Sequence, residues 1–516
     1  VGGAWARARR RRLVMLGLKP RAPRWAVLLR SSSSVSRPLS EVPGPTHWPL
    51  VGSLPDFLKR SGKLDNPDLR EIHASYYREF GNIYRLDLPG LGRHVVICDP
   101  REYLKIFQVE GKYPPGASQT AWPFLRYHEA AGNHTAKKVM LDGEDWHEYR
   151  HALAKDLFGP PAAKEYLPAI AEAAKLASQC APAYEDRFDE FVSRLAFDMF
   201  CALAVGKQSQ TTNPELADPA DLKFVEDSMQ GFSMAGQLMS EPHRKWLPGA
   251  KMANFMASME GAQRRGTEIA IELWDKLEAG QVEGLAANSY MAKLKRRGQL
   301  SKEELGETVM ALLMAGVDTT SYVSAWLLLN LAQNPDKQQR LRDELSSVLQ
   351  GGDLVEDALG KLPYLKACIR ESHRYTPPGV FGGIRKLPQT ATFSGFEVPA
   401  GTMVLLNQVA FQNDPRFVSD PDVFSPERWL PEEVAKRSAE GGDATLLDHR
   451  LLSAPFGYGA RMCLGARVAS LEIQAATCRL VQDHRLELVP GQTWGVKQGL
   501  FAKADPFPKF KLTPLR

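Results

Sequence analysis

The chain has 516 residues, of which 44% are hydrophobic and 24% charged, so it can bury a large core and is neither disordered nor collagen-like. The net charge of +5 is too small for a typical nucleic-acid-binding protein, and residues 1–40 hold ten basic side chains without an acid, which leaves −5 on the rest. The six cysteines show no paired spacing, which argues against a disulfide framework and a multi-cysteine zinc site and favours a reducing compartment.

The first 40 residues have the composition of an organelle transit peptide. They are rich in Arg and Ser, contain no acid and carry scattered Leu, Val and Trp. The apolar runs Leu13–Leu18 and Trp25–Leu29 are shorter than the ~20 residues that a membrane-spanning helix needs. We therefore predict a mitochondrial transit peptide over residues 1–40, with a plastid leader or an unprocessed basic tail as alternatives, and a single folded domain over residues 41–516.

Short apolar runs predict a few strands. The runs Ile83–Leu88 and His94–Cys98, separated by a Pro/Gly segment, predict a β-hairpin. Three further runs around glycine turns predict short strands at Ala391–Phe393, Phe396–Val398 and Thr402–Leu406. Most of the remaining chain has helical patterning, so the predicted fold class is mainly α with small β-sheets.

The clearest predicted helix lies in the middle of the chain. It begins at the capping box Ser301-Lys302-Glu303-Glu304 and runs to Asn334, directly before Pro335. At 1.5 Å per residue it spans roughly 50 Å. Residues 309–332 are apolar on nearly every face, which predicts that the helix passes through the protein centre.

A glycine-rich loop, Phe456–Gly465, places Cys463 just before an amphipathic helix that contains Leu471, Ile473 and Leu480. The positive end of that helix and the backbone N–H groups near Gly465 favour a thiolate. A lone cysteine in a tight turn would more often be inert. This loop, however, resembles the haem-binding signature of the cytochrome P-450 family, Phe-x-x-Gly-x-Arg-x-Cys-x-Gly, at all five fixed letters: Phe456, Gly459, Arg461, Cys463 and Gly465.

The resemblance extends from about Pro43 to the C-terminus and implies the cytochrome P-450 fold. In that fold a haem b lies between the long central helix and the Cys-loop helix, with Cys463 as the iron ligand. A thiolate in this position is the ligand for which the family is known, because its electron donation favours O–O cleavage. Phe456, Gly459, Arg461 and Gly465 are then cofactor-binding residues.

A second motif, Glu371-Ser372-His373-Arg374, is similar to the family's Glu-x-x-Arg. The i,i+3 spacing puts both charges on one face of a helix. In the family a second arginine, which matches Arg428 in Pro426–Trp429, joins the carboxylate. The resemblance implies a buried network of Glu371, Arg374 and Arg428 that orders the loop before the cysteine; the alternative is two unrelated surface ion pairs.

Within the central helix, Ala315-Gly316-Val317-Asp318-Thr319-Thr320 is similar to the family's oxygen-activation motif. The resemblance implies that Ala315 and Gly316 let the haem and dioxygen approach closely. It also implies that Thr319 hydrogen-bonds to the iron-bound oxygen or to a water beside it, and that Asp318 relays protons from outside. Two alternatives stay open: Gly316 admits a neighbouring helix, and Thr319 bonds back to its own helix.

Trp146 and Arg150 match the family's Trp-x-x-x-Arg, whose i,i+4 spacing sends both side chains to one side of a helix. By resemblance they hold a haem propionate together with Arg461, and Arg385 is expected as a third basic partner. As an isolated pattern, Trp146 and Arg150 would be an ordinary pair on a helix face.

The mitochondrial branch of the family is the most similar. Lys366 and Arg370 lie one turn apart on a helix and match the two basic positions with which that branch docks an acidic ferredoxin. Their alternative is a solvated charged face. One position departs from the branch, because Ala466 stands where a basic residue commonly follows Cys-x-Gly and Arg467 comes one residue later.

We therefore predict a monooxygenase that inserts one oxygen atom of O2 into a small lipophilic, sterol-like substrate. NADPH electrons would reach it through a reductase and a ferredoxin of the adrenodoxin type. The predicted location is the matrix side of the mitochondrial inner membrane with peripheral membrane association, and plastid and endoplasmic reticulum are alternatives. Alternative functions are a haem-thiolate isomerase or dehydratase and a non-catalytic haem or ligand carrier. Four segments are expected to line the substrate pocket: Tyr113–Thr135, Phe232–Met256, Thr376–Phe381 and Gln498–Lys503.

Overall fold

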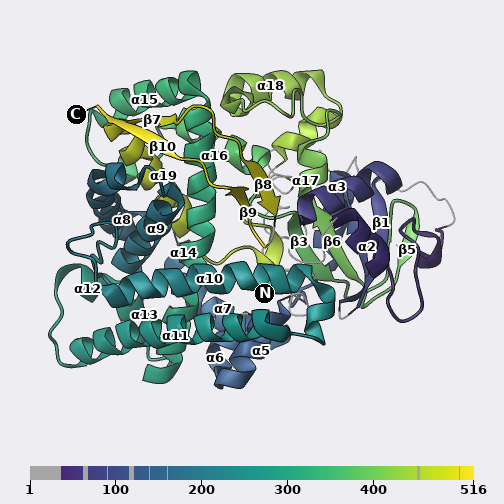
Figure 1. Ribbon diagram of the computed structural model, residues 1–516, viewed down its shortest axis with the longest axis horizontal. Coiled ribbons are helices and arrows are strands. Elements are labelled where there is room, and N and C mark those ends of the chain that lie inside the picture. The colour runs from purple at the N-terminus through teal and green to yellow at the C-terminus, as the bar shows by residue number, and fades with distance from the viewer. Residues whose placement is uncertain are drawn as a thin grey trace, which may run out of the picture.

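The computed structural model describes residues 36–61, 68–89, 91–115, 121–138, 140–159, 161–449, 452, 454–498 and 500–515. Helices dominate it and surround the long helix α14 (Lys302–Gln333), with a small sheet to one side of it (Figure 1). The mainly α fold with small sheets is confirmed.

The remaining α-helices follow in chain order: α2 (Leu54–Ser61), α3 (Leu69–Phe80), α4 (Pro100–Val109), α5 (Trp122–Ala131), α6 (His134–Lys137), α7 (Gly143–Phe158), α8 (Pro161–Cys180), α9 (Phe188–Ala204), α10 (Pro219–Ser240), α11 (Gly249–Glu278), α12 (Gly284–Asn288), α13 (Tyr290–Arg297), α15 (Pro335–Leu349), α16 (Pro363–Tyr375), α17 (Gln408–Gln412), α18 (Pro431–Glu440) and α19 (Ala466–Asp483). Short 3-10 helices include η2 (Leu39–Glu41), η3 (Ala181–Tyr184), η4 (Pro242–Lys245), η5 (Glu356–Ala358), η6 (Pro426–Trp429), η7 (Asp443–Asp448) and η8 (Gly459–Arg461).

The described strands form one sheet of four strands and three sheets of two. The larger sheet has the order β1-β2-β6-β3, in which β1 (Ile83–Leu88) and β2 (Gly92–Ile97) form the predicted hairpin. In the same sheet β2 pairs with β6 (Met403–Asn407) in parallel, and β6 pairs with β3 (Phe381–Lys386) antiparallel. The two-stranded sheets are β4 (Ala391–Phe393) with β5 (Phe396–Val398), β7 (His484–Leu488) with β10 (Phe510–Pro514), and β8 (Gly495–Gln498) with β9 (Ala502–Asp505).

Helix α14 is the predicted central helix. Its N-terminal capping box is present, since the Ser301 hydroxyl accepts from the Glu304 N–H and the Glu304 carboxylate accepts from the Ser301 N–H. The helix is long and apolar enough to cross a membrane by composition, and 67% of its most apolar stretch is buried inside the protein. That burial accounts for a composition that is apolar on nearly every face.

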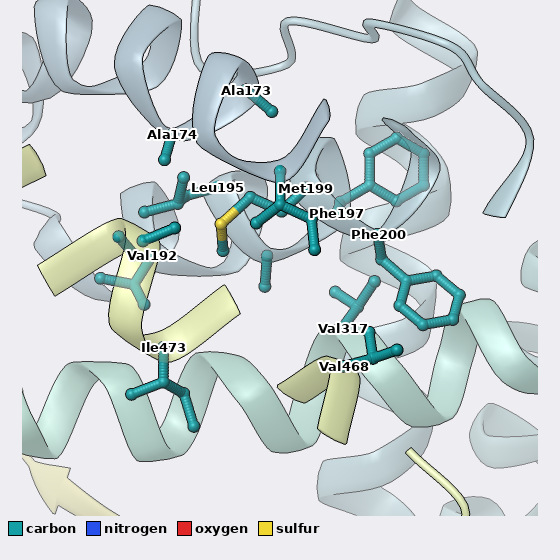
Figure 2. Close-up of a cluster of buried hydrophobic side chains, with 14 of the residues drawn as sticks. Ala173, Ala174, Val192, Leu195, Phe197, Met199, Phe200, Val317, Val468 and Ile473 are labelled. Carbon is teal, nitrogen blue, oxygen red and sulfur yellow. The ribbon is translucent and has the colours of Figure 1, made fainter. Parts of the chain in front are cut away.

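The main core lies where α14 meets α8, α9 and α19. Figure 2 shows side chains from all four helices in one cluster, including Ala173 of α8, Phe197 of α9, Val317 of α14 and Ile473 of α19. Each of these four side chains is at most 3% exposed. Helix α19, which follows the Cys loop, is therefore fixed rigidly against the central helix.

The fold includes residues that we assigned to the leader. The Arg37 N–H donates to the Gly395 carbonyl, and the Arg37 carbonyl accepts from the Glu397 N–H, so Arg37 extends the small β4–β5 sheet. The Arg37 guanidinium also lies 3.8 Å above the Phe396 ring. The rest of the predicted transit peptide, residues 1–35, lies outside the described residues.

Candidate active site

The Cys loop brings one thiol to the start of α19. The Cys463 N–H donates to the Phe456 carbonyl (2.8 Å), which closes the loop over Gly459. Gly459 has a φ of 75°, and a Cβ there would lie 2.0 Å from Glu110 Oε1, so only glycine fits this turn. Cys463 is the exposed one of the six cysteines, three residues before α19 begins.

The protonation of Cys463 differs from our expectation. Desolvation by the surrounding chain is the largest effect and raises the pKa of the thiol above its usual value; the Gly465 N–H lowers the pKa, as predicted, and so does the charge of Arg150. The protein alone therefore favours the thiol, and the predicted bias towards thiolate is wrong without a cation. A metal ion that binds this sulfur deprotonates it.

The predicted Trp146–Arg150 pair lies against the Cys loop. Arg150 of α7 donates to the carbonyl of Met462, the residue before the cysteine. Trp146 is buried and supports Arg461, whose guanidinium lies 3.6 Å above the indole ring. Arg461 is held in turn by the carbonyls of Pro114 (2.9 Å) and Leu141 (2.8 Å).

Arg385 of β3 is also at the loop. It donates to Glu110 (2.8 Å) and to the Tyr458 carbonyl (2.9 Å) and is buried. Sequence analysis missed Glu110, because an acid at the end of a helix carries no pattern that links it to β3. The acid gives Arg385 a partner inside the protein and fastens β3 to the Cys loop.

Three arginines thus converge beside the cysteine. Burial is the main cause that lowers the pKa of Arg461 to about 10, and the neighbouring charges of Arg385 and Arg150 lower it further against the attraction of Asp142 and Glu110. Guanidinium groups crowded in this way favour an additional anionic partner. The carboxylates of a haem would meet that requirement.

An accessible stripe lies on α14. Leu312, Ala315, Gly316, Thr319 and Val323 keep partial or full accessibility at helical spacing, while most of the residues between them are buried. Helix α14, which carries the stripe, is tied to α19, which follows the Cys loop, because the Thr320 hydroxyl donates to Glu472 of α19 (3.3 Å). An accessible thiol, three converging arginines and this stripe fit a haem with its two propionates.

Both alternatives that we considered for the α14 motif are present. The Thr319 hydroxyl donates to the Ala315 carbonyl (2.8 Å), within its own helix. A Cβ on Gly316 would lie 2.7 Å from the Phe200 ring, so this glycine admits α9. Ala315, by contrast, is exposed on the stripe.

Asp318 is fully buried and lies against α10. Its Oδ2 accepts from the Ser228 hydroxyl (2.6 Å), and its Oδ1 has no hydrogen-bond partner within the described structure. Burial raises the pKa of Asp318 to about 7. Asp318 has no direct contact with solvent, so the proton relay predicted for it stays a prediction that needs a neighbouring group.

The predicted charge network is present and fully buried. Glu371 of α16 accepts two hydrogen bonds from Arg374 and one from Arg428. It also accepts from the Trp429 indole (2.8 Å) and the Ser425 N–H (2.9 Å), two partners that the motif does not contain. The arginines then donate to five carbonyl groups of the segment that leads into η6: Gln412, Ser419, Asp420, Pro421 and Val423. The alternative of two surface ion pairs is wrong.

The two residues of the predicted docking pair, Lys366 and Arg370, lie in different environments. Lys366 is exposed, as expected for a solvated position on α16. Arg370 instead lies 4.0 Å above the Trp429 ring, donates to the Leu447 carbonyl and is partly buried. The expectation that both charges stand on one exposed turn is therefore wrong for Arg370, because Trp429 covers it.

The four predicted pocket segments meet beside α14. Phe124 contacts Phe232 at 5.2 Å between ring centroids, and Phe232 stacks on Phe501 at 6.2 Å. Phe501 also contacts Tyr322 of α14 (5.5 Å), and the neighbouring Ala502 N–H donates to the Pro378 carbonyl. The wall that adjoins the stripe is therefore aromatic, and Tyr322 is a member that sequence analysis missed.

Comparison with known proteins agrees with this geometry. The family model for cytochrome P450 matches residues 42–507. The chain is 26% identical to "Probable cytochrome P450 49a1" of Drosophila melanogaster, with 94% of this chain and 84% of that protein covered. It is 28% identical to "1,25-dihydroxyvitamin D(3) 24-hydroxylase, mitochondrial" of Mus musculus, with 87% and 84% covered. It is also 26% identical to "Probable cytochrome P450 12c1, mitochondrial" of Drosophila melanogaster, with 96% of both chains covered.

Proposed function

Because the chain belongs to the cytochrome P450 family of haem-dependent monooxygenases, we propose that it oxygenates a lipophilic substrate with NADPH electrons that a ferredoxin delivers. The observation that carries this proposal is the accessible Cys463 thiol beside three arginines, on a loop whose following helix α19 is hydrogen-bonded to the helix that carries the stripe, α14. When bound there, haem supplies the activation of O2 and the transfer of one oxygen atom.

In this proposal Cys463 holds the iron, and Arg150 and Arg461 hold the carboxylates. Arg461 is the better oriented of the two, because Trp146 and two backbone carbonyls fix its guanidinium plane. Arg385, already paired with Glu110, contributes charge and anchors the loop. Phe456 contacts the buried His373 ring (6.0 Å), so the loop also packs on α16.

Two side chains of α14 take part in proton transfer in this proposal. Thr319 Oγ1 lies on the accessible stripe with its own proton directed to Ala315, so its lone pairs accept hydrogen bonds from water or another donor on the stripe. Asp318 takes up or releases a proton near neutral pH, since burial raises its pKa to about 7. Its single hydroxyl partner, Ser228, connects the carboxyl group to α10.

The stoichiometry of turnover tests the proposed activity. With ferredoxin, reductase and a bound substrate, the holoprotein should consume one NADPH for each oxygenated product. The Thr319→Ala variant should bind haem and substrate normally but divert electrons to peroxide, because proton delivery fails after substrate binding. Product formed without NADPH consumption would favour the isomerase. Absence of both product and NADPH consumption would favour the carrier.

We also propose a mitochondrial location with a leader that ends before Arg37, because Arg37 is part of the folded domain. The acid-free composition of that segment and the printed names of the mitochondrial relatives support it. The inner membrane on the matrix side is where the proposed ferredoxin would meet the enzyme. Import of the radiolabelled chain into isolated mitochondria, with cleavage of the leader, is the test; failure of import would favour the plastid or reticulum.

A further inference from the structure

A cavity opens where the β8–β9 turn meets α10 and α14. Its interior volume is about 40 Å³, and it is open to solvent. Its lining comes from α10, α14 and the hairpin: Phe232, Ser233, Gln237, Tyr322, Lys497, Leu500, Phe501 and Lys503. The three elements converge near the middle of Figure 1, where β8 and β9 lie beside α14 above α10.

The position of the hairpin turn is fixed by close packing. A Cβ on Gly236 of α10 would lie 2.6 Å from the Leu500 backbone nitrogen, so the turn rests directly on the helix backbone. On the other side, the Trp326 indole of α14 donates to the Ala502 carbonyl (2.9 Å). The cavity is therefore a built feature of the fold.

One wall of the cavity is apolar and adjoins the stripe on α14. Phe501 lies between Phe232 and Tyr322, as described above. Tyr322 is three residues after Thr319 on α14, which is a rise of ~4.5 Å along the helix. A ligand that reaches the stripe from this cavity passes along the aromatic wall.

The outer wall is positively charged. Lys497 and Lys503 are directly opposite each other in the β8–β9 register, and both line the cavity. Like charges in that position destabilise a strand pair. Lys497 is paired with Asp505 (3.3 Å), whereas the ion pairs found among the described residues give Lys503 no acidic partner. Gln237 and Ser233 add hydrogen-bonding side chains, and the described lining contains no carboxylate.

We propose that this cavity binds the anionic end of the substrate, and that the substrate is a lipophilic carboxylate. The proposal rests on the proposed function, because it takes the aromatic wall as the path to the oxygenated carbon. A carboxylate beside Lys503 relieves the repulsion between the two lysines and accepts hydrogen bonds from Gln237 or Ser233. The apolar part of the substrate then extends past Phe501 towards Thr319, so oxygenation occurs away from the charged end.

Two matched pairs of probes test the proposal on the haem-loaded full chain: dodecanoic acid with dodecyl alcohol, and cholanoic acid with the corresponding alcohol. Binding is followed by the low-spin to high-spin change of the haem spectrum and, independently, by titration calorimetry. The variants are Lys503→Gln, Lys503→Arg, which keeps the charge, and Lys511→Gln, which removes the same charge from the exposed face of β10.

We expect Lys503→Gln to weaken binding of the tighter-binding acid about fivefold and to leave its alcohol unchanged, as for loss of a partly screened ion pair. Lys503→Arg and Lys511→Gln should retain the wild-type affinity. Higher salt should weaken binding of the acid to the wild type and not to Lys503→Gln.

Several results would overturn the proposal. The charged subsite would be refuted if Lys503→Gln lost equal affinity for the acid and for its alcohol, or if the wild type bound an alcohol but not its acid. Either result would leave the proposed monooxygenase activity untouched. Loss of binding to phosphatidylserine vesicles with unchanged acid affinity would assign Lys503 to a membrane surface instead. If no probe of either pair bound the wild type, the lipophilic substrate of the proposed function would fail as well.

Discussion

Replacing Glu371 with glutamine should destabilise the protein strongly although it removes only one charge. Glu371 is fully buried and is the carboxylate that Arg374 and Arg428 share, and these arginines are 2% and 7% exposed. Breaking a buried charge network from one side costs about 3–5 kcal/mol, because the remaining charges stay buried without compensation. Since a typical native state is stable by about 5–15 kcal/mol, such a loss removes a large part of the margin.

The matched control is Glu427→Gln in the adjoining η6. Glu427 is partly exposed, pairs with Lys337 and Arg340, and accepts from the Tyr364 hydroxyl (2.8 Å). Because glutamine keeps a side-chain oxygen that can accept from Tyr364, its replacement should cost about 1 kcal/mol or less. Urea unfolding followed by circular dichroism, together with haem content per chain, measures both variants. Equal midpoints and equal haem content in the two variants would refute the argument that Glu371 holds the loop through buried charge.

Three further perturbations follow from the site. Burial of Asp318 keeps a proton on the native state between pH 3.8 and about 7, so wild-type stability falls as the pH rises through that window. The melting temperature of Asp318→Asn should therefore rise relative to that of the wild type as the pH increases from about 4.5 to 7.5. A difference in melting temperature that stays constant over this range would contradict the argument. Gly316→Ala should lower the free energy of unfolding by about 1–3 kcal/mol, because the added methyl group meets Phe200. In a Phe200→Leu background the same change should be neutral or stabilising. Equal effects in both backgrounds would exclude the contact with Phe200 as the cause. Lys366→Glu should raise the ferredoxin concentration needed for half-maximal turnover several-fold without a change in melting temperature. Arg370→Glu should instead lower the melting temperature, because it removes the contact of Arg370 with the Trp429 ring. A weaker response to ferredoxin in Arg370→Glu and a lower melting temperature in Lys366→Glu would show that docking uses Arg370.

The parts of the fold that the sequence predicts well carry local signals. Ser301 and Glu304 define the start of α14 by a capping box that needs only neighbouring residues, and the strands Ile83–Leu88 and Ala391–Phe393 coincide with apolar runs between turns. β6 begins one residue later than predicted, at Met403. The strands β7 and β10 were not predicted, since their pairing joins segments that are distant in the chain.

The residues of the site also fall into those that a local sequence signal predicts and those that depend on distant segments. Cys463, Glu371 and Arg374 are recognisable because each stands in a spaced motif whose chemistry is local. The covering of Arg370 by Trp429 and the packing of Phe200 on Gly316 depend on contacts between distant segments, which a single sequence does not encode in any spacing. The pKa of Cys463 was misjudged for a related reason, because helix ends and nearby charges can be inferred locally but desolvation depends on the whole fold.

The most direct test of the account is the spectrum of the reduced carbonyl complex of the wild type and of Cys463→Ser. The wild type should show the red-shifted Soret band that thiolate ligation produces. Serine, a poor and largely protonated donor, should abolish that band even in variant protein that retains haem through Arg150 and Arg461. A Cys463→Ser protein that kept the wild-type band would show that another residue binds the iron, and the assignment of this site would fail.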